Sequence, residues 1–248
     1  MSSDSSEFRS RLALALDMDD LGVAEKLARE LQPYFGVAKV GLELFTAVGP
    51  KSITTFSDIG YDVFLDLKLH DIPTTVAKAA RVAGAFGVRF LTMHTAGGTE
   101  MLSAGVDGFH AGAADAGLSM PIALGVTVLT SASDVSASLL SERVGIALDA
   151  GCDGLVCAGT DLPTVRTQAP DQVLVVPGTR MPDGDTHDQA RSTTPAAALK
   201  AGADLLVIGR MVTHASDPNE ATQALIANLV DKGGPAEPPG FRSTPNHG

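Results

Sequence analysis

Two acids and a lysine interrupt an apolar run at residues 64–75, whose sequence is FLDLKLHDIPTT. Asp66, Lys68 and Asp71 stand where a buried strand would carry hydrophobic side chains. Buried charges are costly unless they are paired, and the residues around them are too apolar for a strand that faces water. We therefore interpret them as an alternating acid–base array with a chemical role. A purely structural ion-pair network is the alternative.

A second group of residues has the chemistry of an anion site. Gly209 and Arg210 follow the apolar run LLVI, and the segment PGTRMPDGDTHDQARSTT (177–194) carries Arg180 and Gln189. Glycine lets the backbone approach an anion, amide N–H groups point at it, and a guanidinium adds a bidentate charge. We expect a phosphorylated substrate here, with the long segment closing over it as a lid. A surface salt bridge is the alternative for Arg210.

The acid–base residues and the anion-site residues can act together only if strands and helices bring them to one place, and the sequence predicts such elements. Short apolar runs recur eight times, at residues 12–17, 37–44, 63–69, 90–95, 121–129, 154–159, 172–178 and 205–210. Helix-like segments lie between them, several opening on Asp, Ser or Thr and closing on Gly. This alternation predicts an α/β fold, a single-domain (β/α)₈ TIM barrel over residues 11–232. The alternative, a doubly wound open sheet, lacks its Gly-x-Gly-x-x-Gly turn after the first strand.

The barrel prediction turns sequence positions into site geometry. Active sites of this fold lie at the carboxyl ends of the strands. Asp17 ends the first run, Lys39 lies in the second, and His94 ends the fourth. Because side chains alternate along a strand, Asp66 and Lys68 should face the same side, with Lys39 of the neighbouring strand in reach.

Composition excludes several other classes of protein. The 248 residues, 44% hydrophobic and 19% charged, can bury a sizeable core. A net charge of −11 without any basic run argues against nucleic-acid binding. No apolar stretch approaches the roughly 18 residues of a membrane span, and MSSDSSEFRS does not resemble a signal peptide. We expect a cytoplasmic protein with no membrane partner.

The remaining signals are structural. Residues 1–10 and the Pro- and Gly-rich tail 233–248 are predicted to be disordered. Cys152 and Cys157 match neither a redox pair nor a zinc cluster, so we predict reduced core thiols. His94 has no second histidine at ligand spacing and is predicted to be packed or hydrogen-bonded rather than to bind a metal.

Taken in order, these motifs resemble the orotidine 5′-phosphate decarboxylase family, from LALALD to GRMVTHASDP, about residues 12–218. The resemblance is carried by VAKVGLELFTAVGP, DLKLHDIPTT, VTVLTS and VVPGTRMPDGDTHDQAR, followed by VIGR. It implies decarboxylation of orotidine 5′-monophosphate to uridine 5′-monophosphate, without cofactor or metal, in a homodimer.

The resemblance also implies a role for each catalytic residue. Lys68 would present its ammonium to C6, stabilise the developing carbanion and supply the proton. Asp66 would lie near the substrate carboxylate, and Lys39 would pair with the acids and contact the ribose. Asp71 and Ile72 would come from the other subunit.

The remaining substrate contacts follow in the same way. The implied ligands are Asp17 and Thr75 at the ribose, Thr130 at the pyrimidine, and Arg180, Gln189, Gly209 and Arg210 at the phosphate.

Three other readings stay open. Keto-gulonate phosphate decarboxylase and hexulose phosphate synthase look similar at Asp-x-Lys-x-x-Asp but work through a magnesium-bound enediolate; Lys39 would repel that metal. The isomerases of tryptophan and histidine biosynthesis share the final Gly-rich loops but not the Asp66, Lys68 and Asp71 set. A catalytically silent nucleotide-binding or assembly protein is the third reading, although a binder gains nothing from a carboxylate that faces an anionic substrate.

Overall fold

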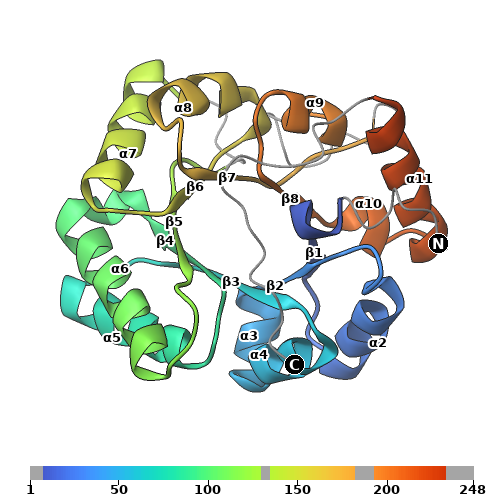
Figure 1. The fold of residues 1–248 in the computed structure, drawn as a ribbon, viewed down its shortest axis with the longest axis horizontal. Helices are drawn as coiled ribbons and strands as arrows, with labels where there is room; N and C mark the ends of the chain where they lie inside the picture. The colour runs from blue at the N-terminus through green and yellow to red at the C-terminus, as the bar shows by residue number, and fades with distance from the viewer. Residues whose placement is uncertain (1–7, 130–134, 182–192, 233–248) are drawn as a thin grey trace.

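The computed structural model of the chain describes residues 8–129, 135–181 and 193–232. Eight parallel strands close into a barrel in chain order, and the helices surround it (Figure 1). The predicted (β/α)₈ TIM barrel is confirmed. The strands are β1 (Leu12–Leu16), β2 (Val37–Gly41), β3 (Asp62–Leu69), β4 (Phe90–His94), β5 (Ile122–Val126), β6 (Gly154–Val156), β7 (Val173–Val176) and β8 (Leu205–Ile208).

The helices of the described residues lie outside the strands. The α-helices are α2 (Leu21–Leu31), α3 (Leu42–Val48), α4 (Lys51–Ile59), α5 (Pro73–Ala85), α6 (Gly98–Asp115), α7 (Ala137–Asp149), α8 (Leu162–Gln168), α9 (Pro195–Lys200), α10 (Arg210–Thr213) and α11 (Pro218–Asp231). Three short 3₁₀ helices are η1 (Arg9–Arg11), η2 (Thr95–Gly97) and η3 (Gly159–Asp161). The expected capping chemistry is present at α2 and α9, where Asp20 and Thr194 accept backbone N–H groups.

Alternation along the strands divides the core into two layers. Ala13, Val37, Phe64 and Phe90 belong to the cluster inside the barrel, whereas residues such as Leu14 pack in the larger cluster beneath the helices. A parallel sheet with both faces covered needs apolar side chains in both directions, which explains the near-continuous apolar runs. The interior is thus a packed core, and polar chemistry is confined to its ends.

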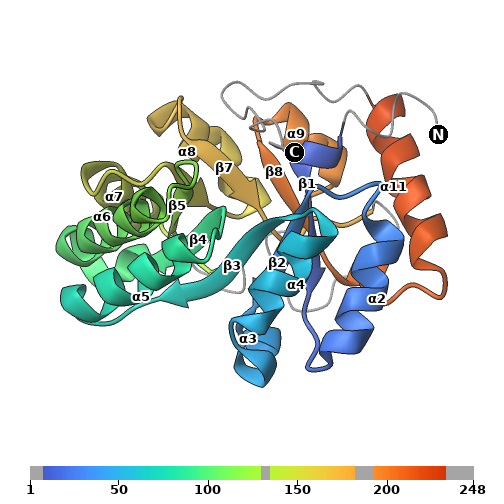
Figure 2. The same ribbon diagram turned by 60° about the horizontal axis from the view of Figure 1, so that its bottom comes forward.

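Strand β3 departs from this regularity where the charges begin. It is the longest strand and runs out towards α5 (Figure 2). Its pairing with β4 shifts register: β3 advances from Leu65 to Leu69 while β4 advances only from Leu91 to Met93. Lys68 lies within this bulge with φ of 50°, the one left-handed non-glycine residue among those described.

The chain is ordered earlier than expected. The prediction of disorder over residues 1–10 is wrong at its end, because Phe8 is buried and η1 follows it. Phe8 packs in the outer core, and the N–H of Gly36 donates to the carbonyl of Arg9 at 2.7 Å. The rest of that segment, residues 1–7, and the tail 233–248 lie outside the described residues.

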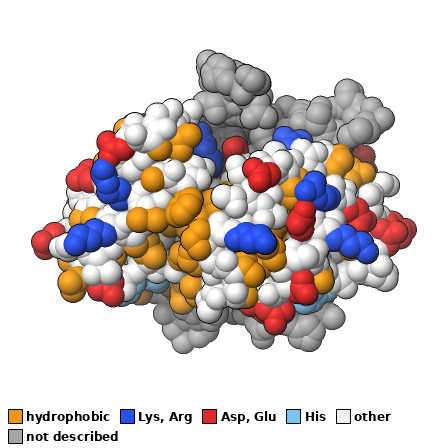
Figure 3. Space-filling view, turned by 90° about the horizontal axis from the view of Figure 1, so that it is seen from below, with side chains coloured by type: hydrophobic (Ala, Val, Ile, Leu, Met, Phe, Trp, Pro, Cys, Tyr) orange, Lys and Arg blue, Asp and Glu red, His pale blue; other side chains and the backbone are white. Residues whose placement is uncertain are grey.

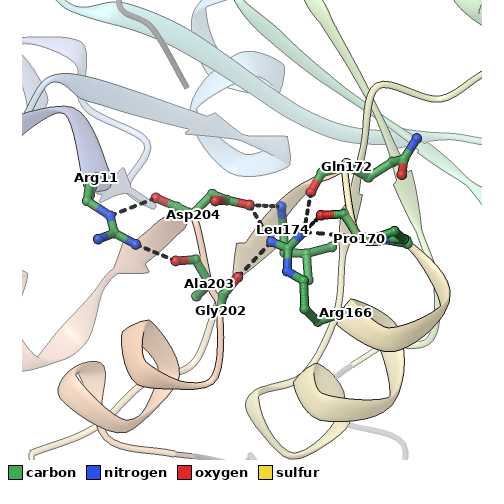
Figure 4. A network of polar contacts seen from close by, with 9 residues as sticks. Arg11, Arg166, Pro170, Gln172, Leu174, Gly202, Ala203 and Asp204 are labelled. Atoms are coloured by element: carbon green, nitrogen blue, oxygen red, sulfur yellow. Dashed lines mark hydrogen bonds and ion pairs between the residues drawn. The ribbon is translucent and has the colours of Figure 1, made fainter. Parts of the chain in front are cut away.

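The amino ends of the strands carry a buried polar network (Figure 4). Arg11 donates to the carbonyl of Ala203 at 2.6 Å. The Asp204 carboxylate accepts from Arg166 at 2.6 Å and from the N–H of Leu174 at 2.7 Å. These contacts join the segment before β1 to β7 and to the turn before β8. No helix in the described parts of the chain is long and apolar enough to cross a membrane.

Candidate active site

A cavity of about 1010 Å³ opens at the carboxyl ends of the strands. Its walls combine the top of the barrel interior with the loops that follow the strands. The lining residues include Asp17, Lys39, Gly41, Asp66, Lys68, Val126, Pro177, Gly178, Thr179, Arg180, Met181, Gly209, Arg210 and His214. Asp66 and Lys68 of the predicted acid–base array therefore share one cavity with Arg180, Gly209 and Arg210 of the predicted anion ligands.

Four of the predicted side chains form a line of alternating charge. The Lys39 ammonium lies 2.7 Å from Asp17 Oδ1 and 3.8 Å from Asp66 Oδ2. The Lys68 ammonium lies 2.8 Å from Asp66 Oδ1. The pleat that turns Val37 and Phe64 inward also turns Lys39 and Asp66 inward, one layer higher. The prediction that Asp66 and Lys68 face the same side, with Lys39 in reach, is confirmed.

The electrostatics of the line centre on Asp66, whose side chain is 15% exposed. Burial raises the pKa of Asp66. The charges of Lys68 and Lys39 and the hydrogen bonds from Lys68 and Thr92 lower it, and together they outweigh burial, so the pKa lies below its usual range. The carboxylate thus stays ionised at neutral pH. Lys39, 8% exposed, is stabilised in the cavity wall by a carboxylate on either side.

Sequence reasoning missed two residues that hold this line. Thr92 of β4 is fully buried, accepts the backbone N–H of Lys68 at 2.9 Å and donates its hydroxyl to Asp66 Oδ1 at 3.0 Å. The sequence could have indicated Thr92 as a hydroxyl residue inside the apolar run FLTMHT, which follows the charged strand β3 in the barrel. Gly41 is the other: a Cβ there would lie 2.6 Å from Asp17 Oδ1 and 3.1 Å from the Lys39 ammonium. The close approach of that ion pair therefore requires glycine.

The predicted anion ligands that the structure describes line the same cavity, after β7 and β8. Gly209 precedes α10 as its N-cap, and Arg210 is the first residue of that helix. Arg180 lines the same cavity, and its N–H donates to the carbonyl of Thr193 at 2.9 Å, which ties together the two sides of the loop after β7. Thr130 and Gln189, along with most of the predicted lid, lie outside the described residues.

Three predicted residues do not reach the cavity of their own chain. Asp71, Ile72 and Thr75 are exposed at the start of α5 and are absent from the cavity wall. Asp71 Oδ1 accepts the N–H of Ile72 at 2.7 Å, and the Ile72 side chain is 65% exposed.

The histidines and cysteines have structural contacts. The rings of His70 and His94 stack with centroids 5.8 Å apart, and His94 Nδ1 accepts the N–H of Ala96 at 3.1 Å. The packed and hydrogen-bonded role predicted for His94 is confirmed. Burial and the nearby charges of His70, Arg143 and Lys68 lower the pKa of His94. Cys152 and Cys157 are buried free thiols, as predicted.

Within residues 8–129, 135–181 and 193–232, no three His, Cys, Asp or Glu side chains come together in a way that could hold a metal ion.

Comparison with known proteins identifies the family. The model described as "Orotidine 5'-phosphate decarboxylase / HUMPS family" matches residues 10–225. The chain belongs to this family.

Relatives within the family match along nearly their whole length. The chain is 42% identical over 230 residues to the orotidine 5′-phosphate decarboxylase of Anaeromyxobacter sp. (strain K), covering 88% of this chain and 98% of the relative. It is 41% identical over 236 residues to that of Moorella thermoacetica, covering 89% and 92%.

Two solved structures share the architecture. The orotidine 5′-phosphate decarboxylase of Lactobacillus acidophilus matches with a TM-score of 0.75 and 33% identity, over 88% of this chain and 98% of that one. An uncharacterized conserved protein from Geobacillus kaustophilus matches with a TM-score of 0.74 and 29% identity, over 88% and 99%. The predicted resemblance to this family is confirmed.

Proposed function

We propose that this protein decarboxylates orotidine 5′-monophosphate to uridine 5′-monophosphate, as the last step of uridine 5′-monophosphate biosynthesis. One observation carries the proposal: the Lys68 ammonium is held 2.8 Å from Asp66 in a cavity that also contains Arg180 and Arg210. The names of the family relatives support the same substrate.

The reaction breaks the bond between C6 and the carboxylate carbon. CO₂ leaves, the electron pair stays on C6, and a proton from the Lys68 ammonium then forms the new C6–H bond. No electron sink exists in the pyrimidine for this pair, so stabilisation must come from a cation fixed before the reaction begins. Asp66 holds that cation in place, Lys39 pairs with the other oxygen of Asp66, and solvent reprotonates the Lys68 amine afterwards. The proposal includes no cofactor and no metal.

The substrate is proposed to lie across the cavity. Asp17 and Lys39 contact the ribose, while Arg180, Gly209 and Arg210 bind the phosphate, with Gln189 joining them. Thr130 hydrogen-bonds the pyrimidine. Binding energy collected at the phosphate can be used to orient C6 against Lys68, because only contacts that improve in the transition state raise turnover.

A magnesium-dependent enediolate reaction is the second candidate, because the family model spans that branch in its description. It needs an acidic ligand where this chain has Lys39. The ammonium lies 2.7 Å from Asp17 and 3.8 Å from Asp66, so it occupies the space between the two carboxylates that a cation would use. This arrangement favours the metal-independent reaction.

The first test follows the loss of orotidine 5′-monophosphate absorbance with purified protein in the presence of EDTA. Wild type should be active, and Lys68→Ala should lose roughly 10³-fold or more in kcat, because the fixed cation and proton donor are both removed. Arg29→Ala removes an exposed cation of α2 and serves as a matched control. An inactive wild type would refute the function, and an active Lys68→Ala would refute the role of Lys68.

We also propose that the active unit is a homodimer in which Asp71 and Ile72 enter the partner's cavity, with Thr75 on the same exposed segment. Ile72 and Leu42 are 65% and 59% exposed. Hydrophobic side chains gather in a band across the face that carries α3, α4 and α5 (Figure 3). A second copy of the chain would cover this band and bring Asp71 towards Lys68.

Complementation tests this arrangement. Inactive Lys68→Ala and inactive Asp71→Ala chains, mixed and allowed to exchange subunits, should regain about one quarter of wild-type activity, because each hybrid dimer rebuilds one complete site. Lys68→Ala mixed with Asp66→Ala is the control and should stay inactive, since both residues belong to the same cavity. Failure of the first mixture, with subunit exchange demonstrated by mass spectrometry, would remove the shared site.

A further inference from the structure

Thr92 is a buried residue beside the Asp66–Lys68 pair that neither the motifs nor the proposed roles include. It lies in β4 opposite the bulge of β3, with 0% of its surface exposed. Its hydroxyl oxygen is 2.9 Å from the backbone nitrogen of Lys68 and 3.0 Å from Asp66 Oδ1. The Thr92 hydroxyl thus contacts both members of the Asp66–Lys68 pair: the backbone of Lys68 and the side chain of Asp66.

The chemistry of a hydroxyl fixes the direction of both bonds. The N–H of Lys68 can only donate, so the Thr92 oxygen accepts there and gives its single proton to the Asp66 carboxylate. Asp66 Oδ1 also accepts from the Lys68 ammonium at 2.8 Å. The result is a closed ring that runs from the Lys68 backbone through Thr92 and Asp66 to the Lys68 side chain.

This ring holds a backbone conformation that is otherwise unfavourable. Lys68 has φ of 50°, and a non-glycine residue in the left-handed region persists only where its surroundings impose it. The bulge removes regular β3–β4 pairing at this point, so the Lys68 N–H needs another acceptor. The Thr92 hydroxyl supplies that acceptor.

We propose that Thr92 is a positioning residue for the decarboxylation: its hydroxyl fixes the Lys68 ammonium by holding the Lys68 backbone and the Asp66 carboxylate together. The inference rests on the proposed function. It predicts that the hydroxyl, rather than the volume of the side chain, determines how well Lys68 is placed.

Two variants separate the hydroxyl from the volume. Thr92→Val keeps the shape and removes both hydrogen bonds, whereas Thr92→Ser keeps the hydroxyl and removes only a methyl group. We expect kcat to fall about 10- to 100-fold in Thr92→Val with KM little changed, because a charged acceptor loses a buried donor. Thr92→Ser should retain activity within about threefold of wild type. Thr92→Ala gives the same test if Thr92→Val is recovered unfolded.

A titration that needs no substrate provides the second readout. Asp66 is faced by Lys68 on its own strand, by Lys39 of β2 and by Thr92 of β4, with Asp17 beyond Lys39. The Thr92 hydrogen bond lowers the pKa of Asp66. The pKa, measured by ¹³C NMR of labelled aspartate and assigned with Asp66→Asn, should rise in Thr92→Val and stay in place in Thr92→Ser.

A lower kcat and a raised Asp66 pKa in Thr92→Val, with both restored in Thr92→Ser, support the proposal. A wild-type kcat in Thr92→Val overturns the proposal. An equal loss of kcat in Thr92→Val and Thr92→Ser also overturns it, as does a loss of kcat with an unchanged Asp66 pKa, because either result indicates that Thr92 acts through packing alone. If wild type itself releases no CO₂, the proposed function has failed separately. The titration alone then decides whether Thr92 holds Asp66 and Lys68 together. An Asp66 pKa that is unchanged in Thr92→Val would overturn this role of Thr92.

Discussion

At the scale of single residues, the charge balance of the cavity depends on Lys39. Its ammonium lies between Asp17 and Asp66, and only 8% of its side chain is exposed. Each carboxylate is tolerable in the cavity wall because a cation lies beside it. Lys68 alone would leave this cluster with a net negative charge next to an anionic substrate.

Lys39→Met should therefore weaken the site without removing Lys68. We expect kcat/KM to fall about 100-fold, the loss typical of one preorganised electrostatic contact. The pKa of Asp66 should rise, since the Lys39 charge is one of the causes that lower it. Activity measured against pH should then be lost at a higher pH on the acid side than in wild type.

The sign of the stability effect follows from the same pKa. Because the pKa of Asp66 is lowered on folding, its ion pairs stabilise the protein above the unfolded value of about 3.9 and this contribution is lost as pH falls through the folded value. Chemical denaturation of Lys39→Met should show a smaller loss of stability between neutral and acid pH than wild type. An unchanged activity profile would contradict the role given to Lys39.

At the scale of elements, helices α5 and α6 are packed unusually closely beside the site. Gly84, Gly108 and Gly112 let their backbones meet: a Cβ at Gly108 would lie 2.3 Å from the carbonyl oxygen of Ala77, and one at Gly112 would lie 2.0 Å from that of Arg81. Helix α5 begins directly after Asp71 and Ile72. The glycines thus fix the position of the segment proposed to enter the partner's cavity.

Gly108→Ala should destabilise the fold by roughly 1–3 kcal/mol, because backbone atoms of α5 must move away. Gly145→Ala in α7 is the matched control: nothing lies within 4 Å of its Cβ position, and alanine in a helix interior should stabilise by up to about 1 kcal/mol. Urea unfolding of both variants measures the difference. Equal effects of the two substitutions would show that α5 and α6 can separate freely.

At the scale of the whole molecule, the barrel is closed by β1 and β8 and by the polar network below them. Arg11 is 1% exposed and donates to the carbonyls of Ala203 and Asp204. Burial lowers the pKa of Arg11, and the charge of Asp204 partly offsets this effect. The network lies at the amino ends of the strands, where residues of this fold serve stability rather than catalysis.

Arg11→Met should destabilise the protein by roughly 2–4 kcal/mol, because two buried carbonyls lose a charged donor. Arg29→Met should change stability by less than about 1 kcal/mol, since its pair with Glu25 is exposed to solvent. Thermal unfolding separates the two variants, and kcat of the folded Arg11→Met enzyme should stay near wild type. A similar loss in both variants would mean that the network does not secure the closure.

Much of this architecture could be predicted from local patterns. Apolar runs, cap residues and the charges that interrupt them are properties of neighbouring residues, and they led to the barrel and to Asp17, Lys39, Asp66, Lys68 and Arg210. The expected strands 121–129 and 154–159 ended too late, because apolar residues continue past the ends of β5 and β6 at Val126 and Val156. Phe8 was misjudged because its burial in the outer core arises from tertiary packing and not from its neighbours in the sequence.

The amino-acid sequence by itself determined the fold class and the chemical character of the site, since alternation and residue type act over a few positions. Only the tertiary structure decided how the charges meet. The bulge at Lys68, the hydroxyl of Thr92 beneath it and the need for glycine at Gly41 arise between strands. Contacts of this kind depend on register and barrel closure, which no single segment of the chain encodes.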